Sequence, residues 1–165
     1  MASEIVWVID TSSIAEIRRS VENTRKVEVF SKLTEMVDKG HLLFPRQVLD
    51  ELERVADQAA PDQQYLWARH NQGTGSTNPP SLDSVKSVLA VVPRVLDPDK
   101  DTGVEEADPY VLAKAADLRR AGVDARIVTE EKNDTPRKMS LRTAAGLLGI
   151  PSVPLRAFLE FESIL

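Results

Sequence analysis

The sequence predicts a single α/β domain in which helices cover both faces of a mainly parallel sheet. Short apolar stretches alternate with longer stretches of helical periodicity. The first apolar stretch, 5–9 (IVWVI), is apolar on both faces, as in a central parallel strand. Of 165 residues, 42% are hydrophobic and 28% charged, which suits one globular domain over 1–165. We therefore expect a three-layer α/β/α sandwich.

The first half of the chain alternates predicted strands and helices. Gly40 is suited to end a helix, and Pro45 is suited to begin one. This β-α-β-α order is typical of parallel sheets. The predicted strands are 5–9 and 42–44, and the predicted helices are 14–18, 27–37 and 46–59.

The second half is regular only in its last part. Residues from about 60 to 101 are predicted to be a loop-rich insertion, because the periodicity weakens there and 71–81 (NQGTGSTNPPS) collects turn residues. Alternation resumes with a helix in which Asp108 is the expected N-cap, Pro109 the first helical residue and Gly122 the stop. The other predicted elements are helices over 82–91, 141–148 and 155–164, and strands over 125–128 and 152–153.

Composition excludes several classes of protein. Without cysteine the chain can form neither disulfides nor a thiolate zinc site. Its first apolar stretch is too short for a signal peptide or a membrane span, so we expect a cytoplasmic protein with no membrane partner. The net charge of −5 argues mildly against nucleic acid binding, unless the acids gather in one pocket that cations fill.

Acidic side chains follow two of the predicted strands. Asp10 comes directly after the first strand, and Glu130 and Glu131 come just after the strand that ends at Val128. Ligands of open α/β sheets bind beyond this edge of the sheet. Because an unpaired buried charge costs several kcal/mol, Asp10 needs a partner there.

Helical phase directs two further acids toward the same region. On the predicted helix 46–59, Glu51 lies about a quarter-turn from the centre of the apolar face, whereas Asp50 lies roughly opposite it. Asp108 lies close to the apolar face of the helix that it begins. Each acid also has a simpler interpretation: Asp108 as an N-cap, Glu51 as a solvated residue, and 130–131 as a charged turn.

Together the four acidic positions predict a bound divalent cation. Two carboxylates about 5 Å apart repel by roughly 3 kcal/mol at an effective dielectric constant of 20. Mg²⁺ and Mn²⁺ relieve this repulsion, favour carboxylate oxygens and are commonly shared with a phosphate. Such an ion can also activate a water molecule and neutralise charge on a phosphoryl group.

The sequence contains, in this order, the segments 6–14 (VWVIDTSSI), 44–55 (FPRQVLDELERV), 105–115 (EEADPYVLAKA) and 126–134 (RIVTEEKND). These four segments resemble the motifs of PIN-domain nucleases, in that family's order. They are a strand with Asp-Thr-Ser, a proline-led helix carrying a glutamate, an Asp-led motif, and a strand followed by a Thr-x-acid-Lys turn. Residues 60–101 match no motif. The resemblance implies a three-layer α/β/α fold and metal-dependent hydrolysis of phosphodiester bonds, often in single-stranded RNA.

The resemblance also implies roles for individual residues. Ser12 is implied as a polar neighbour of Asp10, and Thr129 as a support of the last turn. Many members have Asp where this chain has Glu131, so Glu130 and Asp134 remain alternatives for the fourth acid. The implied catalytic and metal-binding acids, which would hold one or two Mg²⁺ or Mn²⁺ ions, are Asp10, Glu51, Asp108 and Glu131. The basic residues expected to hold the RNA backbone, with a solvated charged loop as an equal alternative, are Arg46, Lys132, Arg137 and Lys138.

The expected function is that of a metal-dependent endoribonuclease. Many small bacterial members of the PIN family are toxins of toxin–antitoxin pairs and many dimerise, so an antitoxin and a second copy of the chain join RNA as expected partners. One alternative is a catalytically degenerate PIN fold that binds RNA or protein without cutting. Another is a phosphatase of the haloacid dehalogenase type, which needs a second Asp where this chain has Ser12.

Overall fold

The computed structural model describes residues 4–56, 62–76, 78–98 and 105–165. Within these ranges each strand is followed by one or more helices, and short 3-10 turns lie at Asn23–Arg25 and Pro93–Val95. The strands are β1 (Ile5–Ile9), β2 (Leu42–Leu43), β3 (Asp124–Val128) and β4 (Ser152–Val153). The helices are α1 (Thr11–Ser20), α2 (Lys26–Asp38), α3 (Arg46–Val55), α4 (Gln63–Gly75), α5 (Leu82–Val91), α6 (Asp108–Arg120), α7 (Leu141–Leu147) and α8 (Leu155–Phe161).

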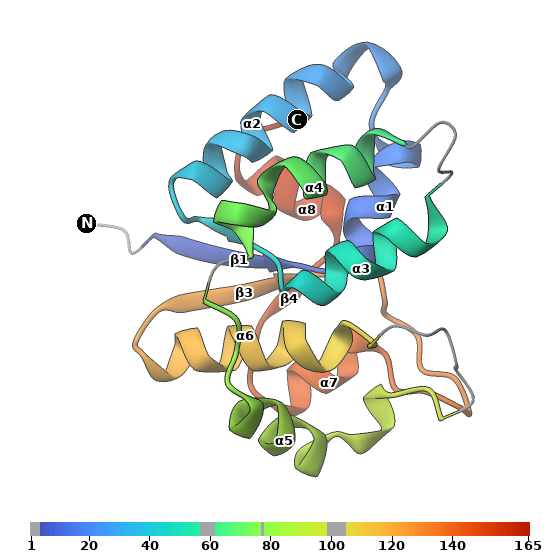
Figure 1. The fold of residues 1–165 in the computed structure, drawn as a ribbon, viewed down its shortest axis with the longest axis vertical. Coiled ribbons are helices and arrows are strands. Elements are labelled where there is room, and N and C mark those ends of the chain that lie inside the picture. The colour runs from blue at the N-terminus through green and yellow to red at the C-terminus, as the bar shows by residue number, and fades with distance from the viewer. Residues whose placement is uncertain (1–3, 57–61, 77, 99–104) are drawn as a thin grey trace.

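The four described strands form one parallel sheet in the order β2-β1-β3-β4. β1 and β3 pair along their whole length, so that Ile9 lies opposite Val128. The next residues along the chain, Asp10 and Thr129, therefore leave the sheet at the same edge. Figure 1 shows this carboxyl edge on the right, facing the start of α6.

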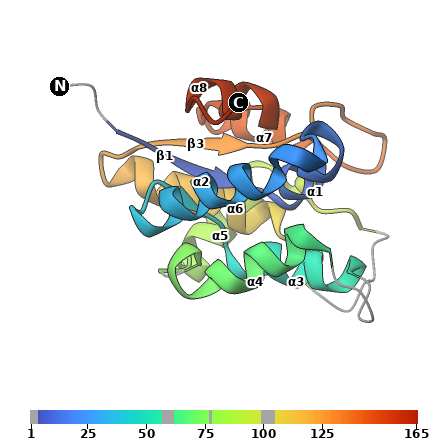
Figure 2. The same cartoon turned by 90° about the horizontal axis from the view of Figure 1, so that it is seen from above.

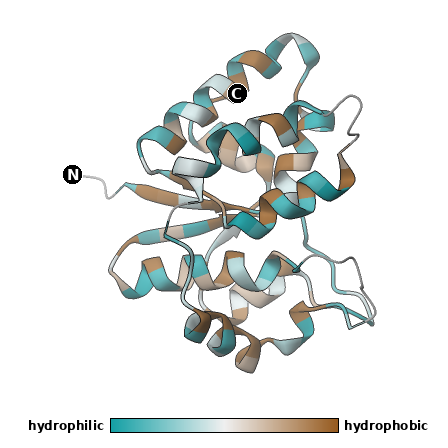
Figure 3. Ribbon diagram, viewed as in Figure 1, coloured by the Kyte–Doolittle hydropathy of each residue, from teal (hydrophilic) through white to brown (hydrophobic). Residues whose placement is uncertain are grey.

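Helices cover both faces of the sheet, which confirms the predicted three-layer α/β/α fold. Figure 1 shows α1, α2, α4 and α8 on one side and α5, α6 and α7 on the other, and Figure 2 shows β1 and β3 running side by side. The hydrophobic residues gather on the strands and alternate with hydrophilic ones along the helices (Figure 3). The core includes the buried side chains of Trp7, Ile9, Ile127 and Phe158. No helix in the described ranges is long and apolar enough to cross a membrane.

The region from 60 to 101 is more helical than the sequence predicts, because its described part contains α4 in addition to the predicted helix over 82–91, which is α5. The loop expected over 71–81 is wrong for 71–75, which form the last part of α4. Gly75 is there for close packing: a Cβ at this position would lie 2.6 Å from the Phe44 ring. The Phe44 N–H also donates to the Gly75 carbonyl (2.9 Å), so this glycine joins α4 to the end of β2.

Two helix boundaries near the carboxyl edge also differ from the prediction. The helix expected over 46–59 ends at Val55, and 57–59 lie outside the described residues. The helix expected to have Asp108 as its N-cap instead has Ala107 in that position, so Asp108 is its first helical residue. This shift of one residue frees the Asp108 carboxylate from capping.

Candidate functional site

Asp10 joins β1 to α1 and has a buried side chain that is only 1% exposed. Its Oδ1 accepts a hydrogen bond from the Ser13 N–H (2.8 Å), so Asp10 is the N-cap of α1. The Ser12 hydroxyl donates to Oδ2 (2.8 Å), and the Thr129 hydroxyl donates to the same oxygen (2.5 Å). The hydroxyls that follow the apolar strand are thus among the groups that solvate a buried carboxylate.

The same two hydroxyls hold the turn after β3 against Asp10. The Glu130 N–H donates to Ser12 Oγ (3.1 Å), and the Glu131 N–H donates to Thr129 Oγ1 (3.0 Å). Each hydroxyl therefore donates to the Asp10 carboxylate and accepts from the backbone of the turn. Ser12 and Thr129 lie where the sequence predicts supporting residues.

Asp108 brings a second buried carboxylate to this edge, with a residue exposure of 7%. No side-chain hydrogen bond caps α6 in the part of the chain that the structure describes, so the interpretation of Asp108 as an N-cap is wrong. Its Oδ2 instead accepts from Lys138 Nζ at 2.5 Å. The carboxylate is held by a cation from the turn between β3 and α7.

Asp10, Asp108 and Glu131 form an acidic cluster in which one carboxylate oxygen from each lies within 4.8 Å of the others. Burial, and then the charge of Asp108, raise the pKa of Asp10 to about 7, although its hydrogen bonds to Thr129, Ser13 and Ser12 act in the opposite direction. Burial, and then the charge of Glu131, raise the pKa of Asp108 to about 7. At neutral pH this acidic cluster favours a proton or another cation.

Glu51 lies at the border of the acidic cluster. Its Oε1 accepts from the Thr11 hydroxyl (2.5 Å) and its Oε2 accepts from the Ala107 N–H (3.3 Å). It therefore links the first turn of α1 to the start of α6, and its charge contributes to the raised pKa of Asp108. The neighbouring Asp50 pairs with Arg46 at 3.7 Å, as the helical phase predicts for a solvated residue.

The three acids in the turn after β3 have separate partners. Glu130 Oε1 accepts the N–H of Leu155 at the start of α8 (2.6 Å). Asp134 Oδ1 accepts the N–H of Ser140 (2.8 Å). Glu131 is the acid of this turn that joins Asp10 and Asp108. Of the three positions left open by the sequence, the geometry favours Glu131.

Lys138 lies inside the acidic cluster rather than on its rim. Its Nζ is 2.5 Å from Asp108 Oδ2 and 3.0 Å from Glu131 Oε1. Burial alone would lower the pKa of this lysine, but the charges of the two acids and their hydrogen bonds outweigh burial and raise it. Spacing could not reveal this contact, because the turn that carries Lys138 is irregular.

The other basic residues that are predicted to hold the RNA backbone differ in whether they form ion pairs with acidic residues. Arg46 pairs with Asp50, and Arg137 pairs with Asp97 at 3.2 Å. Lys132 is exposed and has no ion pair within the described residues. Thr11 and Arg142 also belong to this region, but sequence reasoning assigned them no role.

Comparison with known proteins gives a family for the chain. A family model described as "Domain of unknown function (DUF4411)" matches residues 7–164. The chain belongs to this family. A search of curated proteins found no match. The matched region includes all three members of the acidic cluster, but the family description names no activity.

The donor set of this DUF4411 domain suits a hard divalent cation. Three carboxylates are the ligand type that Mg²⁺ and Mn²⁺ favour. Lys138 contacts one oxygen each of Asp108 and Glu131, which leaves the second oxygen of each carboxylate beyond that contact. With every group ionised, three acids and one lysine leave an excess of negative charge that a divalent ion would offset.

Proposed function

We propose that this DUF4411 domain is a metal-dependent nuclease of the PIN-domain type that hydrolyses phosphodiester bonds of RNA in the cytoplasm. The observation that carries the proposal is the approach of Asp10, Asp108 and Glu131, whose carboxylate oxygens lie within 4.8 Å of one another. They come from three separate segments and meet at the sheet edge where ligands of open α/β folds bind. The four ordered segments that resemble PIN-domain motifs also support this proposal.

The proposed ion is Mg²⁺ or Mn²⁺, held by Asp108, Glu131 and Asp10. When bound, it would activate a water molecule and neutralise charge on the phosphoryl group. Asp10 is already oriented for this role, since hydroxyls and a backbone N–H fix both of its oxygens. Such prior orientation of a ligand is typical of metal sites.

Glu51 and Lys138 complete the proposed site. Glu51 is held by Thr11 beside the acidic cluster, and we assign it the task of orienting the attacking water and accepting its proton. The positive charge of Lys138 would partly neutralise the negative charge of the substrate phosphate.

A second candidate function is a catalytically degenerate PIN fold that binds RNA or protein without cutting. The contact between Lys138 and two of the acids favours it, because an ammonium group offsets part of the repulsion that an ion would otherwise relieve. An antitoxin partner and a homodimer belong to the proposal on the strength of the sequence resemblance alone.

Cleavage of RNA in the presence of Mg²⁺ or Mn²⁺ tests the proposal. We expect the purified wild type to cut structured or unstructured RNA, and Asp10→Asn to reduce the rate by about 10²–10³-fold or more, because an oriented charge at the reacting centre is lost. Asp50→Asn is the matched control, since Asp50 pairs with Arg46 outside the acidic cluster.

Three outcomes separate the candidates. Full cleavage by Asp10→Asn would end the nuclease assignment. Metal binding without cleavage by the wild type would favour the degenerate fold. A covalent aspartyl-phosphate at Asp10 would instead support the phosphatase that the sequence leaves as an alternative.

A further inference from the structure

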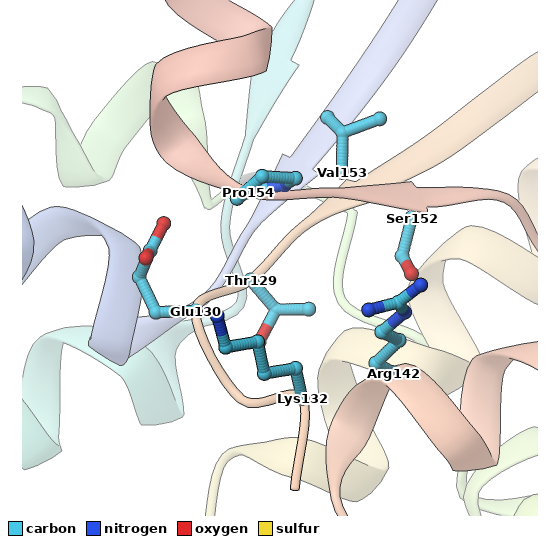
Figure 4. Close-up of a pocket in the computed structure, with 7 residues that line it drawn as sticks. All are labelled: Thr129, Glu130, Lys132, Arg142, Ser152, Val153 and Pro154. Carbon is cyan, nitrogen blue, oxygen red and sulfur yellow. The ribbon is translucent and has the colours of Figure 1, made fainter.

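A cavity of about 210 Å³ lies beside the acidic cluster, between the turn after β3, strand β4 and the start of α7. Figure 4 shows the side chains of Lys132 and Arg142 lining it from two sides, with the Ser152 hydroxyl facing the Arg142 guanidinium. The cavity lies at the carboxyl ends of β3 and β4, the edge that also carries Asp10.

The two cations of this cavity are available to a ligand. Both Lys132 and Arg142 are exposed, and in the described ranges neither has a carboxylate within salt-bridge distance. Arg46 and Arg137, by contrast, pair with acids of the chain. The acid that lines the cavity, Glu130, is directed away from Arg142 in Figure 4 and accepts the N–H at the start of α8.

The cavity and the acidic cluster share a wall. Thr129 lines the cavity, while its hydroxyl donates to Asp10 Oδ2 at 2.5 Å. The Arg142 N–H donates to the Glu131 carbonyl (3.2 Å), which holds the start of α7 against the residue that joins the acidic cluster. An RNA strand that lies across the acidic cluster would therefore also reach the cavity.

We propose that this cavity binds a backbone phosphate of the RNA, next to the phosphate presented to the acidic cluster. The inference rests on the proposed function and names where its substrate lies. Arg142 offers a planar fork that matches two phosphate oxygens, Lys132 adds a point charge and Ser152 a hydroxyl donor. The ligand of the cavity is a phosphodiester group of the RNA rather than free phosphate, because the cavity adjoins the proposed site of cleavage.

The salt dependence of RNA binding tests this inference without requiring cleavage. An Asp10→Asn background is titrated with a short fluorescein-labelled single-stranded RNA of mixed sequence, and anisotropy is followed over a range of salt concentrations. Arg142→Gln should weaken binding several-fold and reduce the slope of log affinity against log salt by about 0.7, the value for one lost phosphate contact on a single strand. Lys132→Gln should do the same.

Two variants guard against an effect of misfolding. Arg142→Lys keeps the charge and should retain most of the slope. Arg19→Gln removes an exposed arginine that pairs with Glu16 in α1, and should change neither the affinity nor the slope. Melting curves of each variant confirm that the fold is intact.

The outcomes distinguish failure of the cavity from failure of the nuclease. Unchanged slopes in Arg142→Gln and Lys132→Gln would overturn the inference, even if the wild type cuts RNA. Displacement of the RNA by inorganic phosphate at the same concentration as the RNA would also overturn the inference, since the cavity would then bind a free anion. Reduced slopes with a wild type that never cuts would support the cavity and refute the nuclease.

Discussion

The two ends of strand β3 treat acidic side chains in opposite ways. At the amino end, Asp124 pairs with Arg126 at 3.0 Å and with Arg119 at 3.6 Å. Hydrogen bonding to Arg126 is the main reason that the pKa of Asp124 is lowered. This acid is therefore satisfied by the chain's own arginines.

At the carboxyl end, acids outnumber the cation that contacts them. Asp10, Asp108 and Glu131 meet there, and Lys138 contacts two of them. Burial raises the pKa of both Asp10 and Asp108 to about 7. The difference teaches that arginines of the chain neutralise the acid at the amino end, whereas the acids at the carboxyl end keep an excess of negative charge. Such an excess is typical of functional sites.

The largest expected effect is on the pH dependence of stability at the carboxyl end. Between about pH 4 and pH 7 the native state holds more protons than the unfolded chain, because the pKa of Asp10 is raised from 3.8 to about 7. Metal-free wild type should therefore lose stability as the pH rises through this range. Relative to Asp10→Asn the loss should reach at most about 4 kcal/mol, at about 1.4 kcal/mol per pH unit.

Urea unfolding at several pH values, with a chelator present, measures this difference. Asp124→Asn is the matched control from the amino end. Its acid has a lowered pKa, so the stability that it adds is present above its ordinary pKa and is lost as the pH falls. Parallel pH profiles for wild type and Asp10→Asn would contradict the raised pKa at the carboxyl end.

Removing the Lys138 ammonium group from the acidic cluster should have the next largest effect on stability. Lys138→Gln should destabilise the metal-free protein by about 1–3 kcal/mol at pH 8, because two acids lose a charged hydrogen-bond donor. The same variant should bind Mn²⁺ more tightly, since a competing positive charge is gone.

Calorimetry of Mn²⁺ binding and urea unfolding measure the two opposite changes in Lys138→Gln. Lys132→Gln serves as control, because Lys132 is exposed and has no ion pair in the described part of the chain. That variant should change stability by less than about 0.5 kcal/mol. If Lys138→Gln left both stability and Mn²⁺ affinity unchanged, the contacts of Lys138 would not matter in solution.

The smallest expected effect is the stabilisation of the wild type by the ion itself. Mn²⁺ at ten times its dissociation constant should add about 1.4 kcal/mol to the free energy of unfolding. Thermal melting with Mn²⁺ and with a chelator checks this, and Asp10→Asn should show a smaller shift. A melting temperature indifferent to both additives would mean that the acidic cluster holds no ion.

Much of the fold and part of the site could be predicted from local patterns. The strands at 5–9 and 152–153 and the helix at 82–91 have the predicted bounds. The phase of α3 separates Glu51, beside the acidic cluster, from Asp50, on the solvated side. These predictions succeed because backbone hydrogen bonding and side-chain direction repeat with a short period in regular elements.

The remaining features depend on contacts between distant parts of the chain. Gly75 resembles a loop residue in the sequence but packs against Phe44. No pattern in the sequence predicts a role for Arg142, although the tertiary structure brings it to the cavity that Lys132 also lines.

The sequence by itself determined the strand that leads into Asp10, the positions of the strands along the chain, and the sheet edge at which the acids emerge. Tertiary structure alone decided that Glu131 rather than Glu130 meets Asp10 and Asp108, and that Lys138 turns inward to join them. The reason is physical: strands and helices repeat a local geometry, whereas an irregular turn takes its shape from the distant groups with which it forms hydrogen bonds.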